Sequence, residues 1–359
     1  MKIAYISGSY VPDRGADSVH VMAMCDALAQ CGHDVTLCAR PGTEPTTDDF
    51  AFYGATRSFR IEKVARPQVR VWGALVNAWL AGRRAQQSSP DLLYAREIFG
   101  LAVAARSGIP FVYELHWKPK HAVDRGLQRW LFRQPGFRRL VFISERLKDI
   151  YQETFPELDP SKLLVAHDAA NVPELSSVRA SEHDARLQVG YVGGFLPGYG
   201  IEVIVELARR LPELDFHIVG GREPDVRSWR ADTFAISNLT FHGFVPPSVL
   251  PQRYAHFDVV LAPYQANTRH IDWISPMKLF EYMAYGKAIV CADFPVMREI
   301  LDDGHNAILI PPSDIAAYES ALLRLRDAQL RQTLGDNARA KLEREFTWRK
   351  RAELVLSGL

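Results

Sequence analysis

The sequence predicts an α/β protein built from two doubly wound parallel-sheet domains. Short runs of β-branched and aromatic residues alternate with helical stretches, which is the pattern of a parallel sheet covered on both faces. The pattern fills the first half of the 359 residues and restarts after a polar stretch at 171–186. We therefore expect one domain over 1–171, a second over 172–345, and a last helix over 346–359 that is a candidate to pack back on the first.

In the first domain, five short apolar runs are predicted as buried strands. They lie at 3–7, 35–39, 92–94, 111–113 and 140–143. The first helix is predicted over 18–30, where apolar residues recur at helical spacing, and Gly32 begins the turn into the second strand.

The second domain repeats the alternation. Its predicted strands lie at 188–192, 216–219, 239–241, 259–262, 288–291 and 307–310. A glycine-rich turn follows the first of these strands and leads to a helix over 201–211 that ends at Pro212. Ligands of such sheets bind beyond the carboxyl ends of the strands, so we expect the two domains to face each other across a cleft.

The composition is that of a globular protein, with 47% hydrophobic and 24% charged residues and a net charge of +1. No apolar run reaches the roughly 18 residues of a transmembrane helix, and the N-terminal residues have the pattern of a strand and not of a signal peptide. The four cysteines form no Cys-x-x-Cys pair. Reduced thiols in a cytoplasmic protein are therefore expected.

The stretch 117–148 carries an excess of basic residues. Nine lysines and arginines stand against Asp124 and Glu145, with aromatic residues such as Trp117 and Trp130 between them. This pattern is typical of a basic amphipathic segment that rests on an anionic membrane surface. A solvated helix face is the alternative. Nucleic acid is not expected as a partner, because the overall charge is near neutral and no recognition motif appears.

The run from Ser275 to Val290 predicts a helix followed by a buried strand. Ser275 is expected to cap the helix, with Pro276 at its first position and Gly286 at a left-handed end. A cation in the first turn opposes the helix dipole, so Lys278 is either a surface residue paired with Glu281 or faces a bound anion such as a diphosphate. In the second case, Glu281 lies one turn further in and accepts hydrogen bonds from sugar hydroxyls.

Two glycine-rich loops precede helices. The first contains Gly15 and joins the first strand to the first helix, and the second contains Gly193, Gly194 and Gly198. Glycine lets the backbone approach a ligand closely, and a helix N-terminus attracts phosphate. Neither loop is a dinucleotide fingerprint or a Walker A motif. Tight turns that need glycine for their geometry are the alternative.

Glu114 and His116 follow the strand at 111–113 and are expected on one side of the chain at its carboxyl end, where catalytic groups collect. His167 and Asp168 either line a ligand site or form a domain-boundary turn. Asp-x-Asp, Gly-x-Ser-x-Gly and His-Glu-x-x-His are all absent from the sequence, so neither a metal nor another cofactor is expected.

Taken together, these segments resemble the retaining glycosyltransferases of the GT-B type, family four. The run 275–290 is the most specific part of the match. The other matching segments are 32–35, 114–116, 143–144, 191–194, 217–221 and 241–244. The resemblance implies two Rossmann-like domains, with a nucleotide-sugar held by the second and the acceptor by the first, and transfer that retains the anomeric configuration and usually needs no metal.

The resemblance also implies residue roles. Glu281 matches the glutamate that grips the nucleotide ribose, Gly15 the loop near the donor phosphates, and His116 the histidine beside the donor sugar. The implied nucleotide-sugar site consists of Gly15, Gly193, Gly194, Gly198, Phe244, Ser275, Pro276, Met277, Lys278 and Glu281. The implied catalytic residues are His116, Glu114 and Lys278.

The chain departs from the family pattern at three positions. The usual first glutamate, eight residues before Glu281, is Trp273, so Trp273 and the neighbouring Asp272 are candidates for contacts with the donor sugar. The usual basic pair falls on Gly194 and Tyr199. Lys278 is therefore expected to be the main cation for the diphosphate.

The expected function is a cytoplasmic, metal-independent, retaining glycosyltransferase of the hexosyltransferase type, peripheral on the inner face of the membrane. It would use a UDP- or GDP-sugar and a glycan or lipid-linked glycan acceptor in polysaccharide biosynthesis. Two alternatives are a nucleotide-sugar 2-epimerase of the same architecture and a catalytically silent nucleotide-sugar binder. The epimerase would consume its substrate without an acceptor, and the silent binder would show no turnover.

Overall fold

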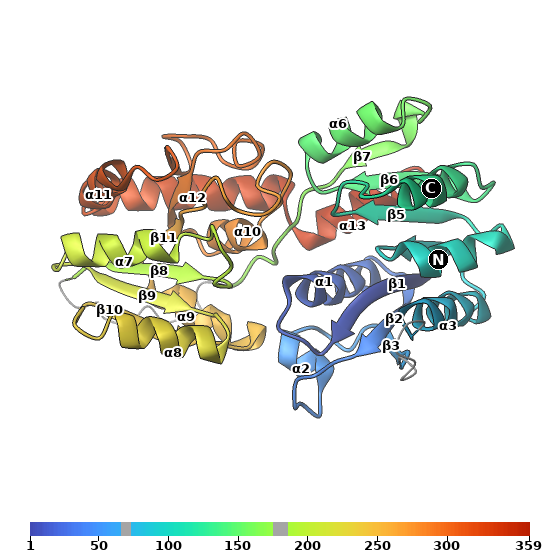
Figure 1. Ribbon diagram of the computed structural model, residues 1–359, viewed down its shortest axis with the longest axis horizontal. Coiled ribbons are helices and arrows are strands. Elements are labelled where there is room, and N and C mark those ends of the chain that lie inside the picture. Colours follow the sequence, from blue (N-terminus) through green and yellow to red (C-terminus); the bar gives the residue numbers. More distant parts are fainter. Residues whose placement is uncertain (66–72, 175–185) are drawn as a thin grey trace. The chain divides into compact units, whose positions relative to one another are not determined.

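The computed structural model describes residues 1–65, 73–174 and 186–359 (Figure 1). The chain divides into two compact units: unit 1 holds Met1–Asp168 with Trp348–Leu359, and unit 2 holds Ala169–Thr347. Most of the predicted linker, 175–185, lies outside the described residues. Because the chain returns to unit 1 at Trp348, its last helix belongs to the same unit as its first strand.

Unit 1 is a sheet of seven parallel strands in the order β3-β2-β1-β4-β5-β6-β7, with helices in the connections. Its strands are β1 (Lys2–Val11), β2 (Asp34–Pro41), β3 (Arg60–Lys63), β4 (Leu92–Ala95), β5 (Phe111–Leu115), β6 (Phe137–Phe142) and β7 (Leu163–Val165). Its α-helices are α1 (Ala16–Gln30), α2 (Asp49–Tyr53), α3 (Gly73–Gln87), α4 (Ile98–Ala104), α5 (Ala122–Phe132), α6 (Glu145–Thr154) and α13 (Trp348–Leu356).

Unit 2 is a sheet of six parallel strands in the order β10-β9-β8-β11-β12-β13. Its strands are β8 (Gln188–Val192), β9 (Asp215–Val219), β10 (Leu239–Gly243), β11 (Val259–Ala262), β12 (Ala288–Ala292) and β13 (Ile308–Ile310). Its α-helices are α7 (Ile201–Arg210), α8 (Glu223–Asp232), α9 (Leu250–His256), α10 (Met277–Ala284), α11 (Ile315–Arg324) and α12 (Ala328–Glu345).

The two edge strands β3 and β7 are absent from the sequence-based prediction. Each pairs on one side only, β3 with β2 and β7 with β6. Strand β3 has the sequence Arg-Ile-Glu-Lys and is half-exposed, so it lacks the continuous apolar run that marks a buried parallel strand. Sheet edges of this kind leave little signal in a sequence.

The core of unit 2 has two layers, one on each face of its sheet. Alternate strand residues enter opposite layers: Val259 and Leu261 pack with α7, α8 and α11, whereas Val260 packs with α9, α10 and α12. This alternation is why the strands are apolar throughout and could be recognised in the sequence.

The strand order reverses beside one central strand in each unit. Strand β1 lies between β2 and β4, and β8 lies between β9 and β11. Doubly wound sheets bind ligands at such switch points, beyond the carboxyl ends of the strands. The loops after β1 and β4, and those after β8 and β11, are therefore the places in which to look for a site.

Helix α13 packs alongside α1 in unit 1 (Figure 1). Arg139 of β6 holds its far end, because Nη1 donates to the carbonyl oxygen of Val355 at 2.8 Å and Nη2 to that of Ser357 at 2.8 Å. A cation at the carbonyl end of a helix also complements the helix dipole. None of the helices in the described part of the chain has the length and hydropathy needed to cross a membrane.

We expect Arg139→Met to lower the free energy of unfolding of unit 1 by about 1–3 kcal/mol, because charge-assisted hydrogen bonds to α13 are lost. Hydrogen exchange of the α13 amides should also become faster than in the wild type. The control is the neighbouring Arg138→Met, since Arg138 is exposed and donates only to Pro135 among the bonds recorded here. Equal losses in the two variants would contradict the proposed clamp.

Candidate functional site

Helix α10 begins one residue later than predicted. Pro276 is the residue that caps it, without a side-chain hydrogen bond, so the prediction that Ser275 caps the helix is wrong. Ser275 is buried and lies just before the helix. The prediction for Gly286 is confirmed, because its φ of 59° is left-handed and its amide bonds to Met283. Helix α10 thus presents Met277 and Lys278 in its first turn, after the loop that follows β11.

Lys278 does not lie on the surface. Its Nζ is buried, and among the described residues it has no hydrogen-bond partner. Three tyrosine rings surround it, with centroids at 3.9 Å (Tyr191), 5.1 Å (Tyr264) and 5.4 Å (Tyr199). Burial lowers the pKa of Lys278 to about 7, and Cys291 and Glu281 oppose this shift. The surface-pair interpretation is therefore wrong: the amine is confined and lacks an acceptor.

The glycine loop after β8 meets this amine. A side chain at Gly193 would place its Cβ 2.6 Å from Lys278 Nζ, and the φ of 153° there also favours glycine. The same loop is tied to the loop after β11, because the carbonyl oxygen of Gly198 accepts hydrogen bonds from Gln265 N (2.8 Å) and Thr268 Oγ1 (2.6 Å). Gly194 is exposed. Gly193 therefore keeps the space beside the lysine open.

Glu281 lies one turn after Lys278 on α10. Its carboxylate accepts a hydrogen bond from Tyr254 of α9, whose ring stacks on Tyr285 at 4.5 Å. Burial raises the pKa of Glu281, while the Tyr254 hydroxyl and the charge of Lys278 favour its ionised form. One side of the carboxylate is thus held by the protein, and the remaining lone pairs can accept hydrogen bonds from a ligand.

The remaining unit 2 candidates differ in their burial. Trp273 is buried, and its ring packs on His270 with 4.9 Å between centroids. Asp272 is exposed, and Phe244 is half-buried after β10. Trp273 is thus packed within unit 2, and a contact of Trp273 or Asp272 with a donor sugar stays a prediction.

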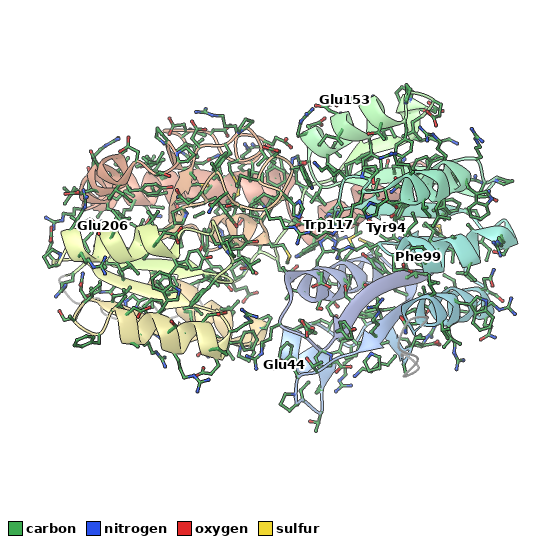
Figure 2. The ribbon with its side chains drawn as sticks, in the orientation of Figure 1. Glu44, Tyr94, Phe99, Trp117, Glu153 and Glu206 are labelled. Carbon is green, nitrogen blue, oxygen red and sulfur yellow. The ribbon has the colours of Figure 1, made fainter. Side chains whose placement is uncertain are left out.

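In unit 1, Glu114 is fully buried at the end of β5 and serves as an acceptor for several groups. Its Oε1 lies 2.7 Å from His116 Nε2 and 2.8 Å from Nε2 of His20, on α1. Its Oε2 lies 3.1 Å from Arg351 Nη1, on α13, and also accepts from Tyr94, which is labelled in Figure 2. The structure thus brings Glu114 and His116 together, as their alternation after the strand predicts.

The charges around Glu114 determine its ionisation. Burial alone would raise the pKa of Glu114, but Arg351, His20 and the hydrogen bond from His116 hold it well below the usual range. Arg96 adds a guanidinium group 3.8 Å from Oε1. Glu114 is therefore a carboxylate at neutral pH and can only accept hydrogen bonds.

The ionised Glu114 fixes the state of His116. Burial and the charge of Arg96 lower the pKa of His116 to about 4, so its ring is neutral at pH 7. Since the facing oxygen can only accept, the ring hydrogen lies on Nε2 and a lone pair remains on Nδ1. About 16% of the His116 side chain is exposed, compared with 1% for that of His20, so His116 is the more accessible of the two histidines.

Asp168 is a further member of this network in unit 1. Its Oδ1 lies 2.9 Å from Nδ1 of His20, so both nitrogens of the His20 ring face carboxylates. Asp168 is the last residue of this segment of unit 1 before unit 2 begins at Ala169, which agrees with the interpretation as a domain boundary, and its side chain is buried against His20.

The same side chains have the chemistry of metal ligands. Ligand atoms of His20, Glu114 and His116 lie within 4.8 Å of one another. Two guanidinium groups, from Arg351 and Arg96, already share the Glu114 carboxylate, and like charges oppose a divalent cation there. These two positive charges disfavour a divalent cation at this set, and the absence of a metal stays a prediction.

Gly15 caps the N-terminus of α1 in unit 1. Its amide donates to Asp13 Oδ1 at 2.8 Å, and its carbonyl accepts from Ser18. A Cβ there would lie 2.4 Å from Asp17 Oδ1. A side chain at Gly15 would therefore displace the Asp17 carboxylate, and the turn at Gly15 places a helix N-terminus after β1.

The basic stretch 117–148 is not one amphipathic helix. It contains α5, β6 and the beginning of α6. Several of its cations are engaged within unit 1: Arg129 pairs with Glu157 at 3.0 Å, Arg139 binds α13, and Lys148 pairs with Glu145. Trp117 remains about half exposed.

Besides the tyrosines already described at Lys278 and at Glu114 Oε2, four further participants in these two groups were missed by sequence reasoning. They are His20, Arg351, Arg96 and Tyr254. Arg351 carried one signal, because it is a charge on an otherwise apolar stripe of the last helix. The others stand in helices and loops where their residue types are ordinary.

Comparisons with known proteins give the family. Residues 18–172 match the model described as Glycosyltransferase Family 4, and residues 186–327 match that of Glycosyl transferases group 1. The chain is a family 4 glycosyltransferase. The glycosyltransferase is 23% identical over 365 residues to the phosphatidyl-myo-inositol mannosyltransferase of Mycolicibacterium smegmatis, covering 93% of this chain and 87% of that one.

Solved structures confirm the predicted GT-B fold. Anabaena HepE in complex with UDP and glucose matches the glycosyltransferase with a TM-score of 0.75 at 17% identity, covering 100% of both chains. A glycosyltransferase from Rickettsia africae matches with a TM-score of 0.76 at 13% identity and the same coverage. These similarities establish the architecture.

Proposed function

We propose that the glycosyltransferase moves a sugar from a UDP- or GDP-sugar to a glycan or lipid-linked glycan, with retention of anomeric configuration. The observation that carries this proposal is the buried amine of Lys278, which lies beside Gly193 at the switch point of unit 2 and has no hydrogen-bond partner in the part of the chain that the structure describes. An anion that reached this place would supply the acceptor that the amine lacks. A diphosphate also fits the first-turn amides of α10.

In the proposed mechanism, unit 2 binds the donor. Lys278 and the amides of α10 hold the diphosphate, and the open space beside Gly193 admits it. Negative charge grows on the diphosphate as the glycosidic bond breaks, so a cation fixed before the reaction stabilises the transition state more than the ground state. Glu281, steadied by Tyr254, accepts hydrogen bonds from the ribose hydroxyls.

Unit 1 contributes His116 in this mechanism. Its neutral ring offers the Nδ1 lone pair beside the donor sugar, where it accepts a hydrogen bond and orients the sugar for attack by the acceptor hydroxyl from the same face.

The names of the relatives support the substrate class: one is a phosphatidyl-myo-inositol mannosyltransferase, and one solved structure contains UDP and glucose. A lipid-linked acceptor also agrees with the basic and aromatic side chains that remain exposed in 117–148, since such side chains can contact an anionic membrane surface. The proposal therefore includes a cytoplasmic location, peripheral on the membrane.

A transfer assay distinguishes this function from the two alternatives. UDP-glucose and GDP-mannose are incubated with the protein, with and without phosphatidylinositol vesicles or an oligosaccharide acceptor, and the products are followed by NMR. Acceptor-dependent release of UDP or GDP, with a product of retained configuration, supports the proposal. Acceptor-independent formation of a C2 epimer indicates an epimerase, and binding without turnover across an acceptor panel indicates a silent binder.

We expect Glu281→Ala to weaken binding of UDP or GDP by about 10- to 100-fold, since a buried charge-assisted contact contributes about 1.5–3 kcal/mol. Isothermal titration calorimetry measures the loss. Glu281→Gln should recover part of the affinity, because the amide oxygen still accepts. Glu206→Ala is the control: Glu206 lies on α7, is labelled in Figure 2, and pairs only with surface arginines in the recorded contacts. Unchanged affinity in Glu281→Ala would remove the ribose role.

A further inference from the structure

Arg351 reaches the Glu114 network from a distant part of the chain. It lies on α13, only 3% of the residue is exposed, and 237 positions separate it from Glu114. Its Nη1 contacts Glu114 Oε2 at 3.1 Å, while Nε donates to the His167 carbonyl oxygen at 2.9 Å and Nη2 to that of Ala166 at 3.2 Å. All three guanidinium nitrogens are thus engaged inside unit 1.

Helix α13 does not need this charge in order to pack. The ring of Trp348 meets His20 edge-on at 4.9 Å, and Arg139 holds the other end of the helix. An apolar residue at position 351 would fill the same space, and buried ion pairs add little stability compared with apolar packing. The burial of a cation here therefore points to a role for its charge.

The role of that charge follows from the partners of the two Glu114 oxygens. Oε2 of Glu114 is taken by Arg351 and Tyr94, whereas Oε1 faces His116 and His20. A carboxylate held at one oxygen cannot rotate, so its other oxygen stays in place for the histidines. Arg351 therefore determines which Glu114 oxygen His116 meets.

We propose that Arg351 is a positioning residue of the glycosyl transfer site: by holding Glu114 Oε2, it keeps Oε1 bound to His116 and so fixes the His116 ring with its hydrogen on Nε2 and its lone pair on Nδ1. This inference rests on the proposed function, in which His116 lies beside the donor sugar. It places a functional determinant of unit 1 on the last helix of the chain.

The charge balance of the network gives the proposal a pH signature. The groups that face the Glu114–His116 pair are His20 from α1, Tyr94 from β4, Arg96 after β4, Arg351 from α13 and, through His20, Asp168. Removing the positive charge of Arg351 lets the pair take up a proton at higher pH. Proton uptake either removes the Nδ1 lone pair or dissolves the ion pair, and in both cases the acid limb of the rate profile moves upward.

The test combines histidine NMR with kinetics on the full chain. ¹⁵N-labelled wild type, Arg351→Met, Arg351→Lys and the control Arg349→Met are titrated, and transfer from the donor found by the assay above is measured against pH. Arg349 lies on the same helix but is exposed and pairs with Glu353 at 3.1 Å. A residue that merely fastened α13 would not move the His116 titration.

We expect the Nε2–H tautomer of His116 in the wild type. In Arg351→Met the titration midpoint should rise by about one pH unit and kcat should fall at least about tenfold with a smaller change in KM. Arg351→Lys should be intermediate and Arg349→Met unchanged. An Nδ1–H tautomer in the wild type, or a folded Arg351→Met with an unmoved midpoint, overturns the inference.

Two further outcomes are also decisive. If Arg351→Met does not fold, the wild-type tautomer and the midpoint of Arg351→Lys decide, and an unmoved midpoint in that variant counts against the proposal. If the wild type transfers no sugar from any donor tested, the proposed function fails, whereas the tautomer and the midpoint still test the positioning of His116 by Arg351 independently of activity.

Discussion

Lys278→Met is expected to weaken binding of the nucleoside diphosphate by about 30- to 1,000-fold, because truncating one partner of a buried charge pair costs roughly 2–4 kcal/mol. Binding of the nucleoside alone should change little, since the amine lies beside Gly193 and the N-terminus of α10, where only the phosphates are proposed to sit. Calorimetry with UDP and uridine, or with GDP and guanosine, measures the two losses. Equal losses would contradict the phosphate assignment.

The same substitution should stabilise the unliganded protein. Burial lowers the pKa of Lys278 to about 7 from an ordinary value of 10.5, so the unfolded chain binds the proton more tightly than the folded one. The resulting cost is complete below pH 7 and disappears as the pH rises from 7 toward 10.5. At pH 6 we expect Lys278→Met to gain about 2–4 kcal/mol in the free energy of unfolding, and the gain should shrink at pH 9.

Donor binding should carry the opposite pH dependence. A bound diphosphate favours the charged amine, so binding near pH 7 takes up protons and the affinity falls as the pH rises above 7. Arg227→Met is the matched control, because it removes a positive charge from an exposed position on α8 of the same unit. A pH-independent affinity in the wild type, or the same pH dependence in Lys278→Met, would show that the amine does not titrate with the donor.

Glu114→Ala is expected to have the largest effect on stability, with a loss of roughly 3–5 kcal/mol for unit 1, because it leaves the buried guanidinium of Arg351 without its counter-ion. Urea unfolding followed by hydrogen exchange of the β5 amides measures this loss. Glu157→Ala is the control, since the exposed Glu157–Arg129 pair should contribute about 0–1 kcal/mol. A loss no greater than that of the control would contradict a stabilising Glu114 network.

The pairing can be separated from the packing by a double variant. Glu114→Met with Arg351→Met removes both charges, so much of the loss should be recovered relative to Glu114→Met alone. The sign of the pH dependence is also fixed. Because the pKa of Glu114 is held well below its usual range, its stabilising contribution is complete at pH 7 and is lost as the pH falls below about 4. Transfer activity should be lost in Glu114→Ala, in Glu114→Met and in the double variant.

The features that could be predicted from the sequence are those set by local chemistry. Strands β8, β11 and β12 are apolar on both faces. Gly286 ends α10 in the left-handed conformation that glycine adopts most easily. The adjacency of Glu114 and His116 follows from strand alternation alone. Such signals lie within a few residues and need no knowledge of the tertiary fold.

The features that could not be predicted depend on distant parts of the chain. Arg351 and Glu114 meet only after the chain has passed through the whole of unit 2. The tyrosines around Lys278 come from β8 and from two separate loops, and each alone has the character of a core aromatic. The predicted helix cap, Ser275, is one residue too early, because Pro276 can cap a helix as well as begin one.

The return of the chain to unit 1 at Trp348 has a consequence for biosynthesis. On a ribosome, domains fold as units in the order in which they are made. Unit 2 is contiguous, whereas unit 1 is interrupted by it. Until Arg351 is translated, the Glu114 carboxylate is without this guanidinium partner. Unit 1, whose first strand is made before any of unit 2, therefore reaches its final electrostatic state only when α13 has been made.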